Sequence, residues 1–143
     1  MKRAVLDDHL LRDLLADEPS AGLTRLLVNH QPCTTNLYLL RLCKSTVSAQ
    51  GGQLTGSWSL DRRLALGRKL LEIDSEVEIM PMQTIAMRMA EIGNTQRVST
   101  LGAEAIAASE YLKAVLVVWV GDDGLGIRTA AKAHGVAYRT IKQ

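Results

Sequence analysis

The chain has 143 residues, which suits one folded domain, and it carries a formal net charge of +2. Hydrophobic residues make up 47% of the sequence, but there is no Phe and aromatics are only 3%, so the core must be aliphatic. The small positive charge is compatible with a nucleic-acid partner without requiring one. Cys33 and Cys43 form no CxxC pair, which argues against a structural zinc site and a disulfide framework.

No segment has the character of a membrane span. The basic start of the chain has no long apolar stretch behind it, unlike a signal peptide. The longest strictly apolar run, Ala114 to Val120, has seven residues and is too short to cross a bilayer. We therefore expect a protein of the cytoplasm with no membrane partner.

The first half of the chain predicts alternating strands and helices. Four leucines at positions 10, 11, 14 and 15 mark one face of a helix, which Asp7 or Asp8 can cap. Thr34 to Asn36 offer caps for a later helix. In chain order, the pattern predicts a strand at 3–6, a helix from 8, a strand at 23–28, a helix at 37–47, a loop at 50–57 and a helix from 59 or 61 to 71.

The second half continues the alternation and contains the clearest strand. Val115 to Val120 is a continuous, mostly β-branched run, typical of a strand that is covered on both faces. Gly135 is placed to end the helix before it. The predicted elements are a strand at 77–80, a helix at 83–92, a polar connection at 93–100, a helix at 101–114, a strand at 115–120, a helix at 127–134 and a strand at 136–141.

Strands that alternate with helices predict an α/β fold with a parallel sheet covered by helices. We expect a three-layer αβα sandwich whose central, mostly parallel sheet has four to five strands. No internal repeat, low-complexity tract or long linker divides the chain. The whole of 1–143 is therefore expected to form a single domain.

Two acidic pairs follow short apolar runs near opposite ends of the chain. Asp7 and Asp8 come directly after the first predicted strand, and Asp122 and Asp123 come after the strand at 115–120. In an open α/β sheet, ligands bind at the carboxyl ends of the strands. Carboxylates gathered there are ligands that hard divalent cations prefer. The sequence thus predicts a divalent-cation site, with Glu104 as a further candidate ligand.

Three ordered segments carry a resemblance to a known family. They are 5–11, 101–110 and 117–125, the last followed by 129–136, and Asp122 stands 18 residues after Glu104. Their order of strand, acid and helix resembles the PIN-domain nucleases, which include the toxin ribonucleases of VapBC-type systems. The resemblance covers both ends of the chain well and the middle only by the order of elements.

The resemblance implies a single PIN-like domain that hydrolyses RNA phosphodiesters with Mg²⁺ or Mn²⁺. Asp7, Glu104 and Asp122 are the catalytic and metal-binding residues that it implies, directly or through water. Asp8 and Asp123 are neighbours that could substitute for these ligands or orient them. A bound cation would neutralise charge on the phosphate and activate a water molecule. The resemblance also implies a homodimer and, for a toxin, a partner antitoxin with a segment inserted near the acidic crevice.

Two departures from the family pattern leave other readings open. The family usually has a further acid on the helix after its second strand, but 37–44 contains none, and Tyr38 and Arg41 stand there instead. The family also often has Thr or Ser just before its last acid, where this chain has 119–121 as Trp-Val-Gly. One alternative is a catalytically weakened PIN-like domain that binds RNA or a partner protein. Another is an unrelated α/β domain whose acids cap helices and turns.

Several other side chains have two interpretations. His9 follows the acids and could touch a phosphate, or it could be a surface helix position. Trp58 is a partner-binding or base-stacking residue if it is exposed, or a filler of the core if it is buried. A set of basic residues either forms the positive border of a nucleic-acid groove or a solvated helix face. The set is Arg41, Arg62, Arg63 and Arg97.

Overall fold

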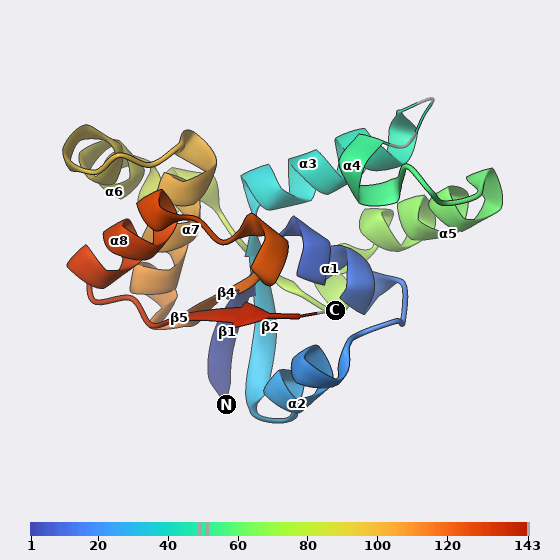
Figure 1. Ribbon diagram of the computed structural model, residues 1–143, viewed down its shortest axis with the longest axis horizontal. Coiled ribbons are helices and arrows are strands. Elements are labelled where there is room, and N and C mark those ends of the chain that lie inside the picture. Colours follow the sequence, from blue (N-terminus) through green and yellow to red (C-terminus); the bar gives the residue numbers. More distant parts are fainter. Residues whose placement is uncertain (49, 51, 143) are drawn as a thin grey trace.

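A computed structural model describes residues 1–48, 50 and 52–142, and within them the chain forms an α/β fold around one five-stranded sheet (Figure 1). The strands are β1 (Lys2–Leu6), β2 (His30–Thr35), β3 (Glu78–Met80), β4 (Val115–Trp119) and β5 (Tyr138–Ile141). Their order across the sheet is β3-β2-β1-β4-β5, and every neighbouring pair is parallel. The fold class predicted from the sequence is confirmed.

Helices cover both faces of this sheet, which gives the three layers of the sandwich. Figure 1 shows α6, α7 and α8 on one side of the sheet and α1 to α5 on the other. The first group is α6 (Met82–Thr95), α7 (Thr100–Leu112) and α8 (Leu125–Ala133). The second is α1 (Asp8–Leu15), α2 (Ala21–Asn29), α3 (Asn36–Val47), α4 (Gly52–Thr55) and α5 (Leu60–Leu71). Short 3₁₀ turns, η1 (Ile73–Ser75) and η2 (Val120–Asp122), complete the described elements.

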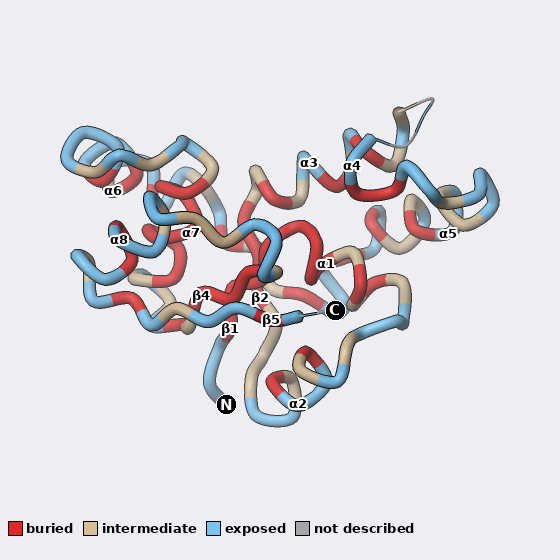
Figure 2. Tube along the Cα trace, viewed as in Figure 1, coloured by how far each residue is buried: buried red, intermediate tan, exposed pale blue. Residues whose placement is uncertain are grey.

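Side-chain alternation along β1 divides the core between the two faces. Val5 packs with residues of α6 to α8, whereas Ala4 and Leu6 pack with α1 and α2. This alternation is the period-two pattern of a strand. Small residues on α7 keep that helix close to the sheet, and α7, β1 and β4 are buried along most of their length (Figure 2). The small residues are Ala103, Ala105, Ala107 and Ala108.

The strands all run in parallel, but the direction in which the chain adds them to the sheet changes once, at β1. We call this change the strand reversal. From β1 the chain adds β2 and then β3 on one side, and it later returns to add β4 and β5 on the other side of β1. Helices that leave β1 and β4 therefore diverge to opposite faces of the sheet. Such a reversal opens a crevice outside the carboxyl ends of the two central strands, where ligands of open α/β sheets bind. Here that crevice lies between the ends of β1 and β4.

The strand predicted at 23–28 is wrong. That segment belongs to α2, whose N-terminus is capped by Ser20 Oγ, which accepts a hydrogen bond of 3.2 Å from the Leu23 backbone. Leu23 and Leu26, spaced one helical turn apart, are its buried residues. The second strand is instead the polar segment that follows. It is held in the sheet by pairing on both sides, and Thr34 Oγ1 also donates a 2.8 Å hydrogen bond to the Leu6 carbonyl.

Smaller differences concern the ends of elements. The expected loop at 50–57 contains the short helix α4, while Gly51 lies outside the described residues. Helix α6 runs three residues beyond its predicted end, into the expected polar connection. Helix α7 begins at Thr100, one residue before its predicted start, and Ser99 caps it. Among the described residues, no helix is both long and apolar enough to cross a membrane.

Candidate metal centre

Asp7 joins the ends of the two central strands. It is the N-cap of α1, and its Oδ1 accepts a 3.0 Å hydrogen bond from the Leu10 backbone N–H. Its Oδ2 accepts a 2.9 Å hydrogen bond from the backbone N–H of Trp119, at the end of β4. Only 1% of Asp7 is exposed. The carboxylate is thus fixed at the strand reversal, where the crevice begins.

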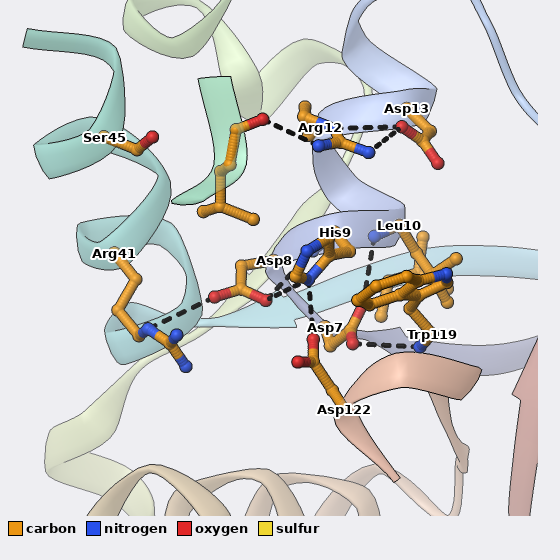
Figure 3. Close-up of polar contacts among 12 residues, drawn as sticks. Asp7, Asp8, His9, Leu10, Arg12, Asp13, Arg41, Ser45, Trp119 and Asp122 are labelled. Carbon is orange, nitrogen blue, oxygen red and sulfur yellow. Dashed lines mark hydrogen bonds and ion pairs between the residues drawn. The ribbon is translucent and has the colours of Figure 1, made fainter. Parts of the chain in front are cut away.

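Four side chains meet at this point. One potential ligand atom from each of Asp7, Asp8, His9 and Asp122 lies within 4.8 Å of the others. Figure 3 shows His9 between the acids, with its Nδ1 2.6 Å from Asp122 Oδ2 and 3.5 Å from Asp8 Oδ1. The His9 ring also lies against Trp119, with 4.2 Å between the ring centroids. The N-cap and first turn of α1, together with η2, therefore form one compact group of three carboxylates and an imidazole.

The close packing of these groups changes their acidity. Burial raises the pKa of Asp7 to about 8, with support from the nearby charges on Asp8 and Asp122 and against its two backbone hydrogen bonds. Burial alone would lower the pKa of His9, but its hydrogen bonds to Asp122 and Asp8 outweigh this and raise it to about 9. Burial acts to raise the pKa of Asp122, yet the contacts with His9 hold it below its usual value. The metal-free group therefore retains protons at neutral pH.

Asp8 has one oxygen whose hydrogen-bonding capacity is unused. Its Oδ1 accepts a 2.9 Å hydrogen bond from the His9 backbone N–H. Its Oδ2 is buried and has no hydrogen-bond partner among the described residues. Arg41 Nε lies 3.3 Å from this oxygen, as an ion pair whose orientation does not make a hydrogen bond. A buried carboxylate oxygen in this state is costly unless a further positive group satisfies it.

The three carboxylates of this group border a crevice of about 240 Å³. Asp7, Asp8 and Asp122 line it, and cationic side chains stand beside them. Arg41 reaches it from α3, and Arg97 from the segment between α6 and α7. Tyr38, Ser99 and Gly102 also line it. The crevice thus combines a carboxylate floor with guanidinium groups, an arrangement that suits a cation together with an anionic substrate.

Glu104 is not part of this group. It is fully buried on α7, and its carboxylate accepts backbone hydrogen bonds from Leu37 at 2.9 Å and Asn36 at 3.3 Å. These two N–H groups belong to the first turn of α3, where a negative charge is stabilised by the helix dipole. The expectation that Glu104 faces the cation with Asp7 and Asp122 does not match this placement, because α7 directs the carboxylate to the start of α3.

Asp123 also lies outside the group, although it follows Asp122 in sequence. It forms an ion pair with Arg128 and accepts a 2.8 Å hydrogen bond from the Tyr138 hydroxyl. Tyr138 and Arg128 hold the pKa of Asp123 below its usual value, against the effect of burial. The turn η2 therefore separates the two neighbouring acids, and Asp122 alone contacts His9.

The predicted basic residues divide in the same way. Arg41 and Arg97 line the crevice, whereas Arg62 and Arg63 lie on α5. Arg62 pairs with Glu18 and covers the Trp58 ring, 3.7 Å from its centroid. Trp58 is half-buried and packs against a hydrophobic cluster of α1, α3 and α5, so it serves as part of the core of that lobe.

His9 is the site residue whose position the sequence indicated least. The sequence left it as either a phosphate contact or a surface position, but only 8% of it is exposed and it lies at the centre of the group. The available signal was its place directly after two acids at a helix N-terminus. Its decisive partner, Asp122, is 113 residues away, and this contact is visible only in the fold.

No protein-family model matches this sequence. No curated protein matches it either.

Proposed function

We propose that this crevice binds a divalent cation, Mg²⁺ or Mn²⁺, and that the protein uses it to hydrolyse RNA phosphodiesters. The observation that carries the proposal is the group of Asp7, Asp8, His9 and Asp122, with ligand atoms within 4.8 Å of one another. This group lies at the strand reversal of a parallel sheet, the usual ligand position of such folds. Its donors are mainly carboxylate oxygens, which Mg²⁺ and Mn²⁺ prefer.

The state of these carboxylates fits a cation. Asp8 Oδ2 is buried without a hydrogen bond from the described residues. The pKa of Asp7 is raised to about 8 by burial and by the charges of two neighbouring acids. A divalent cation would give Asp8 Oδ2 a ligand bond and would displace the proton that Asp7 holds. We infer that Asp7, Asp8 and Asp122 would hold the cation, with His9 as an additional donor or as the partner that orients Asp122.

The remaining residues of the crevice suit a phosphodiester. Arg41 and Arg97 line it and can each donate to phosphate oxygens. The crevice, with a volume of about 240 Å³, has room for a phosphate group. When bound, the cation would neutralise charge on the phosphate and lower the pKa of a water molecule. His9 positions Asp122 through the 2.6 Å contact and keeps a proton within reach of the crevice.

The test compares cation binding and RNA cleavage in matched variants. Isothermal titration with Mn²⁺ measures binding, and gel analysis of a labelled single-stranded RNA measures cleavage. Asp122→Asn should weaken Mn²⁺ binding by at least tenfold and abolish cleavage, because it removes a ligand charge from a side chain that is half-exposed. Asp74→Asn, an exposed acid on η1, is the control and should behave as the parent protein.

Two results would contradict the proposal. If the parent protein takes up no Mn²⁺, the cation site does not exist. If Mn²⁺ binds but RNA cleavage is absent, or persists unchanged in Asp122→Asn, the crevice does not perform the chemistry. A contaminating ribonuclease is recognised because it would be equally active in every variant.

A second candidate is a domain that binds RNA or a partner protein without catalysis. It is favoured by the internal cations of the site: Arg41 lies beside Asp8, and His9 contacts Asp122. These pairs offset carboxylate charge without any metal. This second candidate predicts that isothermal titration with Mn²⁺ gives no heat of binding. It also predicts that RNA binding persists in EDTA. The first proposal also includes a toxin role with an antitoxin partner, and a cytoplasmic location. Both of these rest on the sequence alone.

A further inference from the structure

The opposite edge of the sheet contains a large open hollow. It has a volume of about 920 Å³ and lies between α2 and the edge strand β5, beside the start of β1. Its charged side chains are Lys2, Arg25 and Arg139, all exposed, and no Asp or Glu lines it. Lys2 and Arg139 belong to β1 and β5, and Arg25 projects from α2. Three elements thus bring cations to one concave surface.

A second hollow of about 530 Å³ continues this surface toward the end of α7. It shares Lys2, His30 and Arg139 with the first hollow and adds Arg3 and Lys113. The two adjoining hollows make one basic surface, which lies toward the amino-terminal ends of β1, β2 and β4 and extends along β5. We call it the amino-edge groove; its cations are Lys2, Arg3, Arg25, Lys113 and Arg139.

The positive charge of the amino-edge groove is largely uncompensated. Four of its five cations form no ion pair with any residue that the structure describes; the exception is Arg3, which pairs with Glu78 at 2.8 Å. Its one acidic lining residue, Glu110, is held by Arg88 through hydrogen bonds of 2.7 and 3.0 Å. Five cations and one acid leave a formal excess of four, whereas the whole chain carries +2. Positive charge is therefore concentrated on this edge.

We propose that the amino-edge groove binds the phosphate backbone of a single-stranded nucleic acid, independently of its sequence. Concave basic surfaces that follow a backbone are typical of single-strand binding. No Trp, Tyr or Phe lines either hollow, and the rings present are the imidazoles of His30 and His134, so charged side chains outnumber stacking ones. Its contacts are therefore with phosphates, which position a strand without reading its sequence.

This inference is independent of the acidic crevice, because it concerns binding at the other edge of the sheet and needs no metal. The probe is a fluorescently labelled twelve-nucleotide poly(U), followed by fluorescence anisotropy in EDTA. We expect a dissociation constant on the order of 10–100 µM near physiological salt, as for non-specific electrostatic binding. Affinity should fall steeply as salt rises, because counterions are released from the strand.

The variant removes three cations of the groove at once: Lys2→Gln, Arg25→Gln and Arg139→Gln. All three side chains are exposed, so the protein should fold normally, which circular dichroism checks. Affinity should fall at least tenfold, and the salt slope should fall by about 2, at about 0.7 per lost phosphate contact on a single strand. The matched control is Lys44→Gln, Arg68→Gln and Lys132→Gln, which removes the same charge from exposed positions outside the groove.

Three outcomes would overturn the proposal. The first is equal loss of affinity in the two triple variants, because net charge alone would then explain binding. The second is loss in the control variant only, which would place the strand elsewhere. The third is displacement of poly(U) by polyglutamate as effectively as by unlabelled poly(U), which would make the groove a general polyanion surface.

Discussion

At the scale of single residues, the site depends on protons that two side chains hold. The pKa of Asp7 rises from 3.8 to about 8, chiefly through burial. The pKa of His9 rises from 6.5 to about 9, because its hydrogen bonds to Asp122 and Asp8 outweigh burial. In both cases the folded protein binds the proton more tightly than the unfolded chain. A cation that enters the group must displace this positive charge, so metal binding and protonation compete.

This competition predicts a pH dependence with a definite sign. The stability contributed by Asp7 is complete below about pH 4 and is lost as pH rises toward 8; that of His9 is lost between about 6.5 and 9. The melting temperature of the metal-free protein should therefore fall between pH 6 and 8.5. Saturating Mg²⁺ should raise the melting temperature more at pH 8.5 than at pH 6. At pH 8.5 and a hundredfold excess over Kd, binding should add about 2.7 kcal/mol to the free energy of unfolding. Differential scanning fluorimetry measures both; an equal Mg²⁺ effect at the two pH values would contradict the prediction.

The sequence identified part of this group for a clear reason. Asp7, Asp8 and Asp122 follow apolar runs that form the central strands, and parallel strand ends meet at one edge. The structure brings these three together. The role of His9 could not be derived, because its position depends on contacts across 113 residues of sequence with Asp122. Local pattern thus identified residues at strand ends, whereas tertiary contacts decided which of them touch.

At the scale of elements, the N-terminus of α3 is capped by a buried acid from another helix. Glu104 on α7 accepts the backbone hydrogen bonds of Asn36 and Leu37, in addition to the Thr35 side-chain cap of α3. This contact fixes the start of α3, and hence the helix that directs Arg41 to the crevice. The sequence predicted Glu104 as a ligand of the cation, because the local pattern of a buried capping acid does not differ from that of a metal ligand.

The capping role predicts a separation of stability from metal binding. Glu104→Ala should lower the free energy of unfolding by roughly 2–4 kcal/mol, because two buried N–H groups lose their acceptor and a cavity forms. Urea denaturation measures this loss. Glu104→Gln retains an acceptor oxygen and should leave the Mn²⁺ dissociation constant within about twofold of the parent value. A tenfold loss of Mn²⁺ affinity in Glu104→Gln, as expected for Asp122→Asn, would instead make Glu104 a ligand.

Helix α2 shows the limit of local pattern at this scale. The run from Leu23 to Val28 is apolar enough for a strand, yet Leu23 and Leu26 also fit one helical face. Short apolar runs do not distinguish the two possibilities by themselves. The polar segment His30–Thr35 becomes a strand because it pairs with both β1 and β3, which no local feature reveals.

At the scale of the whole molecule, the lobe of α3 and α5 exposes apolar side chains in two stripes. Leu40 and Val47 are seven residues apart on α3, and α5 adds Leu60, Leu64 and Leu71. These spacings place each set on one face of its helix. Exposed apolar stripes of this kind commonly mark protein–protein interfaces. The homodimer that the sequence resemblance implies would have a suitable surface here.

We predict that this lobe mediates self-association. Sedimentation velocity at about 50 µM protein should show a dimer, because specific interfaces of standard size are stable at such concentrations. Leu64→Lys should give a monomer, because the charge would be buried without a partner. Leu125→Lys, at an exposed position on α8, is the control and should remain dimeric. A parent protein that sediments as a monomer, or equal dissociation by both variants, would refute this assignment.

The two backbone hydrogen bonds that Asp7 accepts affect which residues evolution would conserve. Its carboxylate closes the first turn of α1 and ties it to β4, so selection for folding alone would retain it. If the proposed hydrolysis were lost, selection would still keep Asp7 but would leave Asp122, whose side chain is 34% exposed, free to change. Persistence of Asp7 among homologues would therefore record only the architecture. Persistence of Asp122 would be the signature of retained chemistry.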